Sequence, residues 1–382
     1  MQVQSLYDLS PVLRLMLLAL VIALGPLSWV WLRNGKAQPG RRLAALTLLT
    51  LFLTFDLVLF GAFTRLTDSG LGCPDWPGCY GHMSPTGAHE QITQAQQQMP
   101  QGPVTHRKAW IEMIHRYLAM AVGVLITTLA LATWVQRRRG GTLSPWWPTL
   151  TFAWVCLQGA FGALTVTMKL FPAIVTLHLL GAMVLLVLLC MQAVAYRHHQ
   201  GLGAPATLSA AQRAALWGVF ALVWLQIALG GWVSTNYAVL ACTEFPACQG
   251  SWWPTMNFRE GFELWRDLGM TGGGDHITFP ALTAIHYTHR LAAYVVLVAV
   301  ALLAWRLKGG ALQRQARWLG ALAAWQFATG LSNVVLGWPL LAALSHTGGA
   351  AALVTVLTWA LCESRASVNA IETAPRGREV SA

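Results

Sequence analysis

The sequence is poor in charge, and above all in carboxylates. Only 10% of its 382 residues are charged, with 14 Asp and Glu against 25 Lys and Arg. A soluble domain carries about 25% charged residues, so this chain has too few to cover a surface that faces water. The deficit excludes an ordinary soluble protein. The net charge of +11 does not indicate a nucleic-acid partner either, because the basic residues lie between long apolar runs.

Those apolar runs are the main feature of the chain. Hydrophobic residues make up 55% of it, and nine runs are long enough, at about 20 residues each, to cross a hydrocarbon core of ~30 Å. The runs lack the period-2 alternation of barrel strands, so we expect helices. The predicted spans are residues 12–32, 44–64, 112–136, 149–168, 174–196, 214–235, 284–305, 317–337 and 341–362.

Positive charge is concentrated in every second connection between these spans, which indicates their orientation. The positive-inside rule places such connections in the cytoplasm, with the N-terminus outside and the C-terminus inside. The first positive cluster follows its apolar run, and no A-x-A-like cleavage site comes after it, so we expect a retained helix rather than a signal peptide. The first ten residues contain no Arg, which favours a bacterial plasma membrane over a mitochondrial one. The basic residues are Arg33, Lys36, Arg41, Arg42, Arg137, Arg138, Arg139, Arg197, Arg213, Arg306, Lys308, Arg314 and Arg317.

An internal repeat organises the chain. "GCPDWPGC" at 72–79 and "ACTEFPAC" at 241–248 each hold two cysteines six residues apart, and "LQGAFGAL" at 157–164 corresponds to "WQFATGLS" at 325–332. Each half contains four predicted helices, an even number, so the halves should be related by an axis along the membrane normal. We predict an all-α polytopic membrane protein with two tandem pseudo-symmetric four-helix transmembrane bundles plus one extra N-terminal transmembrane helix.

The repeat also predicts the division of the chain into parts. Residues 1–43 would form the extra helix and a basic cytoplasmic loop, and residues 44–200 the first bundle. Residues 201–364 would form the second bundle, followed by a polar C-terminal tail at 365–382.

Four histidines occupy matching places in the repeat and are candidate haem ligands. At 1.5 Å per residue, they should lie within roughly 10 Å of the outer boundary of the membrane core. One intramembrane histidine is as readily a packing residue as a ligand, but four at symmetric positions favour ligation. Neighbouring side chains do not complete a zinc site, whereas two imidazoles facing each other across a bundle suit the axial positions of a haem. These residues are His115 and His178 in the first half, and His289 and His346 in the second.

Other residues near the histidines have two interpretations each. Arg116 and Arg290 follow a histidine directly; they could pair with haem propionates or snorkel to the lipid headgroups. Gly159, Gly162 and Gly330 would admit a haem ring, or only close helix packing.

The segments "IEMIHR" (111–116) and "IHYTHR" (285–290) share Ile, His and Arg, and one of their differences exchanges ionisable residues. Glu112 lies three residues before His115, on the same helix face, whereas the second half has His286 at the corresponding place. Glu112 could be merely interfacial, or it could exchange protons beside the first haem site. The difference between the halves favours chemistry in the first half only.

The paired cysteines lie in loops that we place outside the membrane, where disulfides persist. We expect the disulfides Cys73–Cys79 and Cys242–Cys248, with a redox role for the first pair as the alternative. We expect Cys156, Cys190 and Cys362, which fall within predicted spans, to be packing residues.

Taken together, these motifs resemble the heme A synthase family. The resemblance rests on "GAFTRLTDSGLGCPDWPGC" (61–79), "EMIHR" (112–116), the other three histidines and the duplicated plan, and it covers roughly residues 44–362. The family is usually described with eight spans, one fewer than predicted here. The Gln-rich loop at 80–110 is also long, so loop structure and partner contacts do not transfer directly.

The resemblance implies a function and a division of labour. The family oxidises the C8 methyl group of haem O to a formyl group, which yields haem A for cytochrome c oxidase. It implies haem O as substrate on His115 and His178, haem b as cofactor on His289 and His346, and Glu112 as the catalytic residue. Haem O synthase and cytochrome c oxidase assembly factors would be partners, and homo-oligomerisation stays open.

Two other functions are compatible with the same residues. A quinol-linked dihaem b-type electron carrier would use all four histidines for electron transfer and modify no haem. A transporter with a proton relay fits less well, because relays place ionisable groups across the membrane, whereas these histidines share one depth.

Overall fold

Within the described residues, nine long helices account for the nine predicted spans. The computed structural model describes residues 10–203 and 205–366, and the predicted tail beyond residue 366 lies outside the described residues. The helices are α1 (Ser10–Arg33), α2 (Pro39–Leu66), α4 (His106–Arg138), α5 (Trp146–Thr167), α6 (Pro172–His199), α7 (Ala210–Thr235), α9 (Phe279–Leu307), α10 (Gln313–Val335) and α11 (Leu340–Glu363). Their ends follow local chemistry: Pro begins α2 and α6, Thr105 caps α4, and Ser209 with Gln212 forms a capping box on α7.

Eight of these nine helices are long and apolar enough to cross a membrane. The exception within the described residues is α10. A helix is present there as predicted for 317–337, but it is not apolar enough to count as a membrane span, so that part of the prediction was wrong. Its Gln, Ser and Asn residues lower its apolarity, and Gln326 is used for a hydrogen bond described below.

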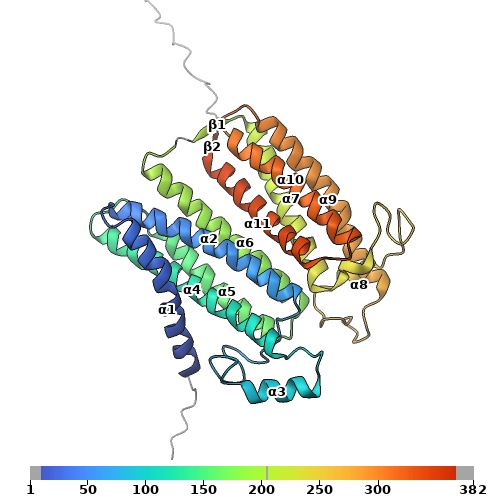
Figure 1. Cartoon of the computed structure of the whole chain (residues 1–382). Helices are drawn as coiled ribbons and strands as arrows, with labels where there is room; N and C mark the ends of the chain where they lie inside the picture. The colour runs from blue at the N-terminus through green and yellow to red at the C-terminus, as the bar shows by residue number, and fades with distance from the viewer. Residues whose placement is uncertain (1–9, 204, 367–382) are drawn as a thin grey trace, which may run out of the picture.

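The helices form two groups of four with the same pattern of neighbours (Figure 1). In the first bundle α2 packs on α4, α4 on α5, α5 on α6, and α6 on α2; in the second, α7, α9, α10 and α11 repeat that cycle. Consequently α4 and α6 lie diagonally across the first bundle, and α9 and α11 across the second. This pattern agrees with the predicted four-helix duplication.

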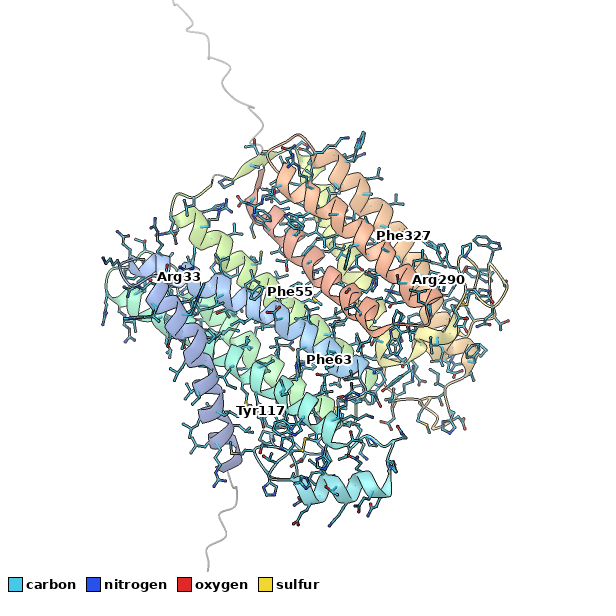
Figure 2. All side chains as sticks on the ribbon, viewed as in Figure 1. Arg33, Phe55, Phe63, Tyr117, Arg290 and Phe327 are labelled. Atoms are coloured by element: carbon cyan, nitrogen blue, oxygen red, sulfur yellow. A yellow bond between two sulfur atoms is a disulfide. The ribbon has the colours of Figure 1, made fainter. Side chains whose placement is uncertain are left out.

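The two bundles meet through α2 and α6 on one side and α7 and α11 on the other. Leu186, Leu216, Val354 and other fully buried residues form a hydrophobic cluster that spans this interface, and Phe55 of α2 packs against it (Figure 2). Helix α1 packs on α4 and α2 and has no counterpart in the second bundle. The extra helix is therefore an addition to the side of the first bundle.

Contacts between corresponding positions also join the bundles. Arg65 donates to the carbonyl of Ser234, and the Tyr237 hydroxyl donates to Asp68 at 2.5 Å; the residues of each pair are 169 positions apart. Cys73 and Cys242 have the same spacing. The pseudo-symmetry axis therefore passes close to these contacts.

The loops at one end hold the remaining regular structure. The short helices α3 (His89–Gln98) and α8 (Phe258–Gly261) and the 3-10 turn Ala238–Ala241 lie in the two long loops that carry the cysteine pairs; we call this end the disulfide end. At the opposite end, β1 (Ala206–Leu208) pairs in parallel with β2 (Ser364–Ala366). These two short strands were not predicted, and they tie the link between the bundles to the end of α11.

Candidate functional site

The four histidines lie in pairs on the diagonal helices of each bundle. His115 on α4 and His178 on α6 belong to the first pair, and His289 on α9 and His346 on α11 to the second. All four helices begin at the disulfide end, so the histidines share a similar depth, roughly 9–15 Å along each helix. Within each bundle the two imidazoles are close enough to interact electrostatically. The structure thus brings each predicted pair together.

Each imidazole lies against a glycine of the preceding long helix. A Cβ built on that glycine would lie 2.9 Å from the Cε1 atom of the ring at Gly230, 3.1 Å at Gly61 and 3.2 Å at Gly330, which are tight contacts, and 3.4 Å at Gly162, which is an ordinary one. The glycine thus provides the space in which the ring sits. The four pairs are Gly61 with His115, Gly162 with His178, Gly230 with His289, and Gly330 with His346.

A glutamine fixes the backbone at the second histidine of each bundle. Gln158 on α5 donates to the carbonyl of His178 at 2.9 Å, and Gln326 on α10 donates to that of His346 at 2.8 Å. Both amides lie in the space left by a glycine one turn later, Gly181 or Gly349. The shared Gln motif of the repeat therefore positions the ligand-bearing helices.

Glu112 connects α4 to the first disulfide loop. The structure contains the disulfide Cys73–Cys79, and Glu112 accepts a hydrogen bond at 2.8 Å from the backbone N–H of Cys73. Its other oxygen accepts from Arg116 at 2.5 Å, and both side chains are less than a tenth exposed. A carboxylate with an arginine and a backbone N–H as donors suits the ionised form.

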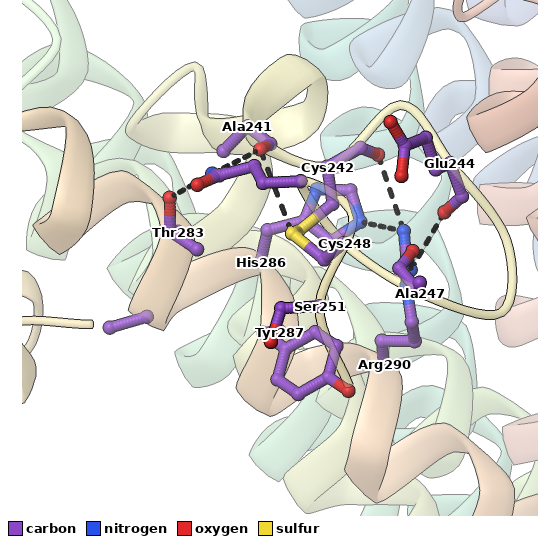
Figure 3. Close-up of a disulfide and its surroundings, with 12 residues drawn as sticks. Ala241, Cys242, Glu244, Ala247, Cys248, Ser251, Thr283, His286, Tyr287 and Arg290 are labelled. Carbon is purple, nitrogen blue, oxygen red and sulfur yellow. Dashed lines mark hydrogen bonds between the residues drawn. A yellow bond between two sulfur atoms is a disulfide. The ribbon is translucent and has the colours of Figure 1, made fainter. Parts of the chain in front are cut away.

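The two arginines that follow a histidine hold the disulfide loops. Arg116 donates to the carbonyls of Asp75, Pro77 and Gly78. Arg290 donates to those of the corresponding residues, Glu244, Pro246 and Ala247, next to the second disulfide, Cys242–Cys248 (Figure 3). The sequence did not predict these partners, and a contact with haem propionates stays a prediction.

His286 replaces Glu112 in the second bundle with different bonding. Its Nδ1 lies 3.0 Å from the carbonyl of Ala238 and its Nε2 lies 3.4 Å from Arg290. Arg290 turns its second amino group to the carbonyl of Cys242. Like Glu112, His286 links its helix to the loop and lies beside an arginine, but it supplies no carboxylate.

The residues present fit a haem in each bundle. The four histidine residues are only partly buried, while the Nδ1 atoms of His115 and His178 are covered, so the accessible surface of those two residues lies elsewhere. No cluster of three or more His, Cys, Asp or Glu residues suited to a metal ion occurs in the described part of the chain. Paired imidazoles alone match axial haem ligation rather than a zinc centre.

Sequence reasoning missed several residues of the site. Gly61 and Gly230 correspond in the repeat, so comparing the halves position by position would have found them. Gln226 and Thr329 contact His289 and His346, and only the structure shows these contacts. Among the predicted packing cysteines, Cys190 is buried and Cys362 partly so, but Cys156 is exposed on α5, and that prediction was wrong for it.

Comparison with known proteins decides the family. A family model described as cytochrome oxidase assembly protein matches residues 44–358. A protein called Heme A synthase from Shewanella oneidensis is 38% identical over 311 residues, 81% of this chain and 92% of the relative. The chain belongs to the heme A synthase family.

Two further relatives of the same name support this membership. The heme A synthase of Mesorhizobium japonicum is 31% identical over 78% of this chain and 84% of its own, and that of Brucella anthropi is 28% identical over 89% and 96%. The resemblance drawn from the motifs is confirmed, and nothing in these comparisons favours the dihaem electron carrier. Helix α1 lies outside residues 44–358, which the cytochrome oxidase assembly protein model matches.

In this heme A synthase family member, we expect Arg290→Gln to loosen the second disulfide loop. Losing hydrogen bonds from a buried charged donor costs about 1.5–3 kcal/mol. Reduction of Cys242–Cys248 by dithiothreitol should therefore be roughly tenfold to a hundredfold faster, as measured by alkylation and mass spectrometry. Arg259→Gln, which removes an exposed arginine on α8, is the control, and an unchanged reduction rate in Arg290→Gln would contradict the assignment.

Proposed function

We propose that the chain is a heme A synthase, which oxidises the C8 methyl group of haem O to a formyl group and so makes haem A for cytochrome c oxidase. One observation carries the proposal beyond family membership. The two bundles hold equivalent histidine pairs, but only the first has a buried carboxylate, Glu112, one turn before its first histidine. The same scaffold is therefore equipped differently for reaction in its two halves.

The substrate and the cofactor are assigned to different bundles. His115 and His178 in the first bundle, residues 44–200, would hold haem O. His289 and His346 in the second bundle, residues 201–364, would hold haem b, which supplies electron transfer when bound. The glycine contacts, present at all four rings, hold the imidazoles at equivalent places in the two bundles, as two equivalent haem sites would require.

Glu112 is the proposed catalytic residue. Oxidation of a methyl group withdraws electrons and protons from a carbon at the edge of the ring, and a fixed carboxylate stabilises the positive charge that develops there or takes up a proton. Arg116 and the backbone N–H of Cys73 hold Glu112 in place. This arrangement keeps the carboxylate oriented before the substrate arrives.

The eight apolar helices identify a multi-pass membrane protein, and we extend this to an orientation. The basic residues end α1, α4, α6 and α9 at the end opposite the disulfides. With that end in the cytoplasm of a bacterial inner membrane, the N-terminus and the haem sites lie toward the outer side. Haem O synthase and oxidase assembly factors are the proposed partners.

We expect Glu112→Gln to retain haem and lose the reaction. The amide keeps the shape and an acceptor for Cys73 but removes the charge, so haem A formation should fall by about 100-fold or more. Haem extraction from membranes supplied with haem O, followed by chromatography, measures haem A against haem O. Glu363→Gln is the control, since Glu363 is a buried carboxylate bonded to His198 at the opposite end. Full haem A formation in Glu112→Gln would overturn the role of Glu112.

Substituting a histidine of one pair should remove only the haem that this pair holds. His346→Ala should lower the haem B content of the purified protein by at least about tenfold, whereas His178→Ala should lower haem O and haem A and leave haem B in place. His276→Ala, which changes an exposed loop histidine, should alter neither. Two haem B molecules per wild-type chain, with no haem O or haem A, would instead support the electron carrier.

The orientation can be tested with exposed cysteines. Thr86→Cys lies in the first disulfide loop and Gln313→Cys at the opposite end, and both native residues are exposed. In intact spheroplasts a membrane-impermeant maleimide should label Thr86→Cys and leave Gln313→Cys unlabelled until the membrane is opened. The reverse pattern would show the opposite orientation.

A further inference from the structure

The two bundles differ in what contacts the Nδ1 atoms of their histidines. In the second bundle Thr329 Oγ1 lies 3.0 Å from Nδ1 of His346, and Gln226 Nε2 lies 3.0 Å from Nδ1 of His289. In the first bundle the Nδ1 atoms of His115 and His178 are buried without a hydrogen-bond partner among the described residues. The histidines match in placement but not in polar support.

Sequence differences at corresponding positions explain the contrast. The spacing that relates His178 to His346 places Phe161 where the second half has Thr329. The spacing that relates Cys73 to Cys242 places Leu57 where the second half has Gln226. Neither Phe nor Leu offers a hydrogen-bonding atom, so the first bundle cannot support its histidines in this way.

The hydrogen bonds of Thr329 define the role of His346. The Thr329 hydroxyl donates to the carbonyl of Trp325 at 2.8 Å, so its lone pairs remain to accept from Nδ1–H. A proton on Nδ1 leaves Nε2 as the free acceptor of the ring, the state that binds iron. Thr329 is mostly buried, at 7% exposure, so water does not compete strongly for this bond.

Gln226 lies beside the other histidine of the second bundle. Its amide donates to the backbone carbonyl of His289 at 3.1 Å while it lies beside Nδ1 of the same residue. Its own Oε1 is buried and has no partner among the described residues. The amide thus fixes the backbone of His289. Because the amide nitrogen is a donor and also lies 3.4 Å from Nε2, it does not give Nδ1–H an acceptor of the kind that Thr329 gives His346.

We propose that Thr329 is a positioning residue that makes the second bundle retain its haem, whereas the apolar Phe161 leaves the first bundle able to exchange its own. The proposal rests on the assignment of cofactor and substrate given above. A hydrogen bond to the second ring nitrogen orients an imidazole ligand and raises its basicity, which strengthens its bond to iron. A cofactor must stay bound through many turnovers, but a substrate haem must enter and its product must leave.

Thr329→Val tests the proposal, because valine keeps the shape and removes the hydroxyl. Haem transfer from the second bundle to apomyoglobin should become about tenfold faster. The midpoint potential of that haem should rise, since a less basic ligand stabilises the ferric state less. A tenfold loss of ferric over ferrous affinity corresponds to a rise of about 59 mV.

Two further variants separate positioning from packing. Thr329→Ser keeps the hydroxyl and should restore the wild-type transfer rate and potential. Thr358→Val removes another buried hydroxyl, which donates to the carbonyl of Val354 on α11 at 2.7 Å, and should change neither quantity.

The outcomes distinguish this inference from the proposed function. If wild-type protein holds haem B on His289 and His346, and Thr329→Val matches it in both transfer rate and potential, the inference fails and the function stands. If Thr358→Val has the same effect as Thr329→Val, the effect comes from packing and the inference also fails. If wild-type protein binds no haem B, the assignment of the second bundle fails first.

Discussion

The site depends on the close approach of each imidazole to a glycine on the preceding long helix. A Cβ at Gly230 would lie 2.9 Å from His289, Gly61 and Gly330 leave only slightly more room, and Gly162 is in ordinary contact with its ring. The glycines therefore let each imidazole pack directly on the neighbouring helix, most closely at Gly230. The same contact at four places explains why two bundles with different residues nearby hold their histidines alike.

The disulfide loops extend this control to the end of the bundles where the histidines lie. Arg116 and Arg290 each follow a histidine directly; Arg116 donates to three loop carbonyls and Arg290 to four. Each loop is therefore fastened to the helix that carries a candidate ligand. In the first bundle this fastening includes Glu112, so the proposed catalytic group also stabilises the structure, and substitutions there need a control for folding.

Much of this architecture was predictable, since long apolar runs and a repeat are properties of the chain itself. The nine helices followed from the apolar runs, the cysteine pairs from their spacing in loops placed outside the membrane, and the pairing of histidines within each half from the repeat. The partners of Arg116 could not be predicted, because a buried arginine and a snorkelling arginine look the same in sequence. Nor could Thr329: a threonine usually bonds to its own helix, as this one also does, and only the packing of α10 on α11 brings it to His346.

The contacts between corresponding positions bear on how a duplicated protein keeps its halves distinct. Two identical half-length chains paired about the same axis would place Arg65 near a second Arg65, and Asp68 near a second Asp68. In this chain the facing residues are Ser234 and Tyr237, which accept from and donate to these charges. Like-charge repulsion therefore disfavours pairing of the first half with itself, and the complementary contacts favour the mixed pair. The two halves differ where they contact each other, so each bundle pairs more favourably with the other bundle than with a second copy of itself.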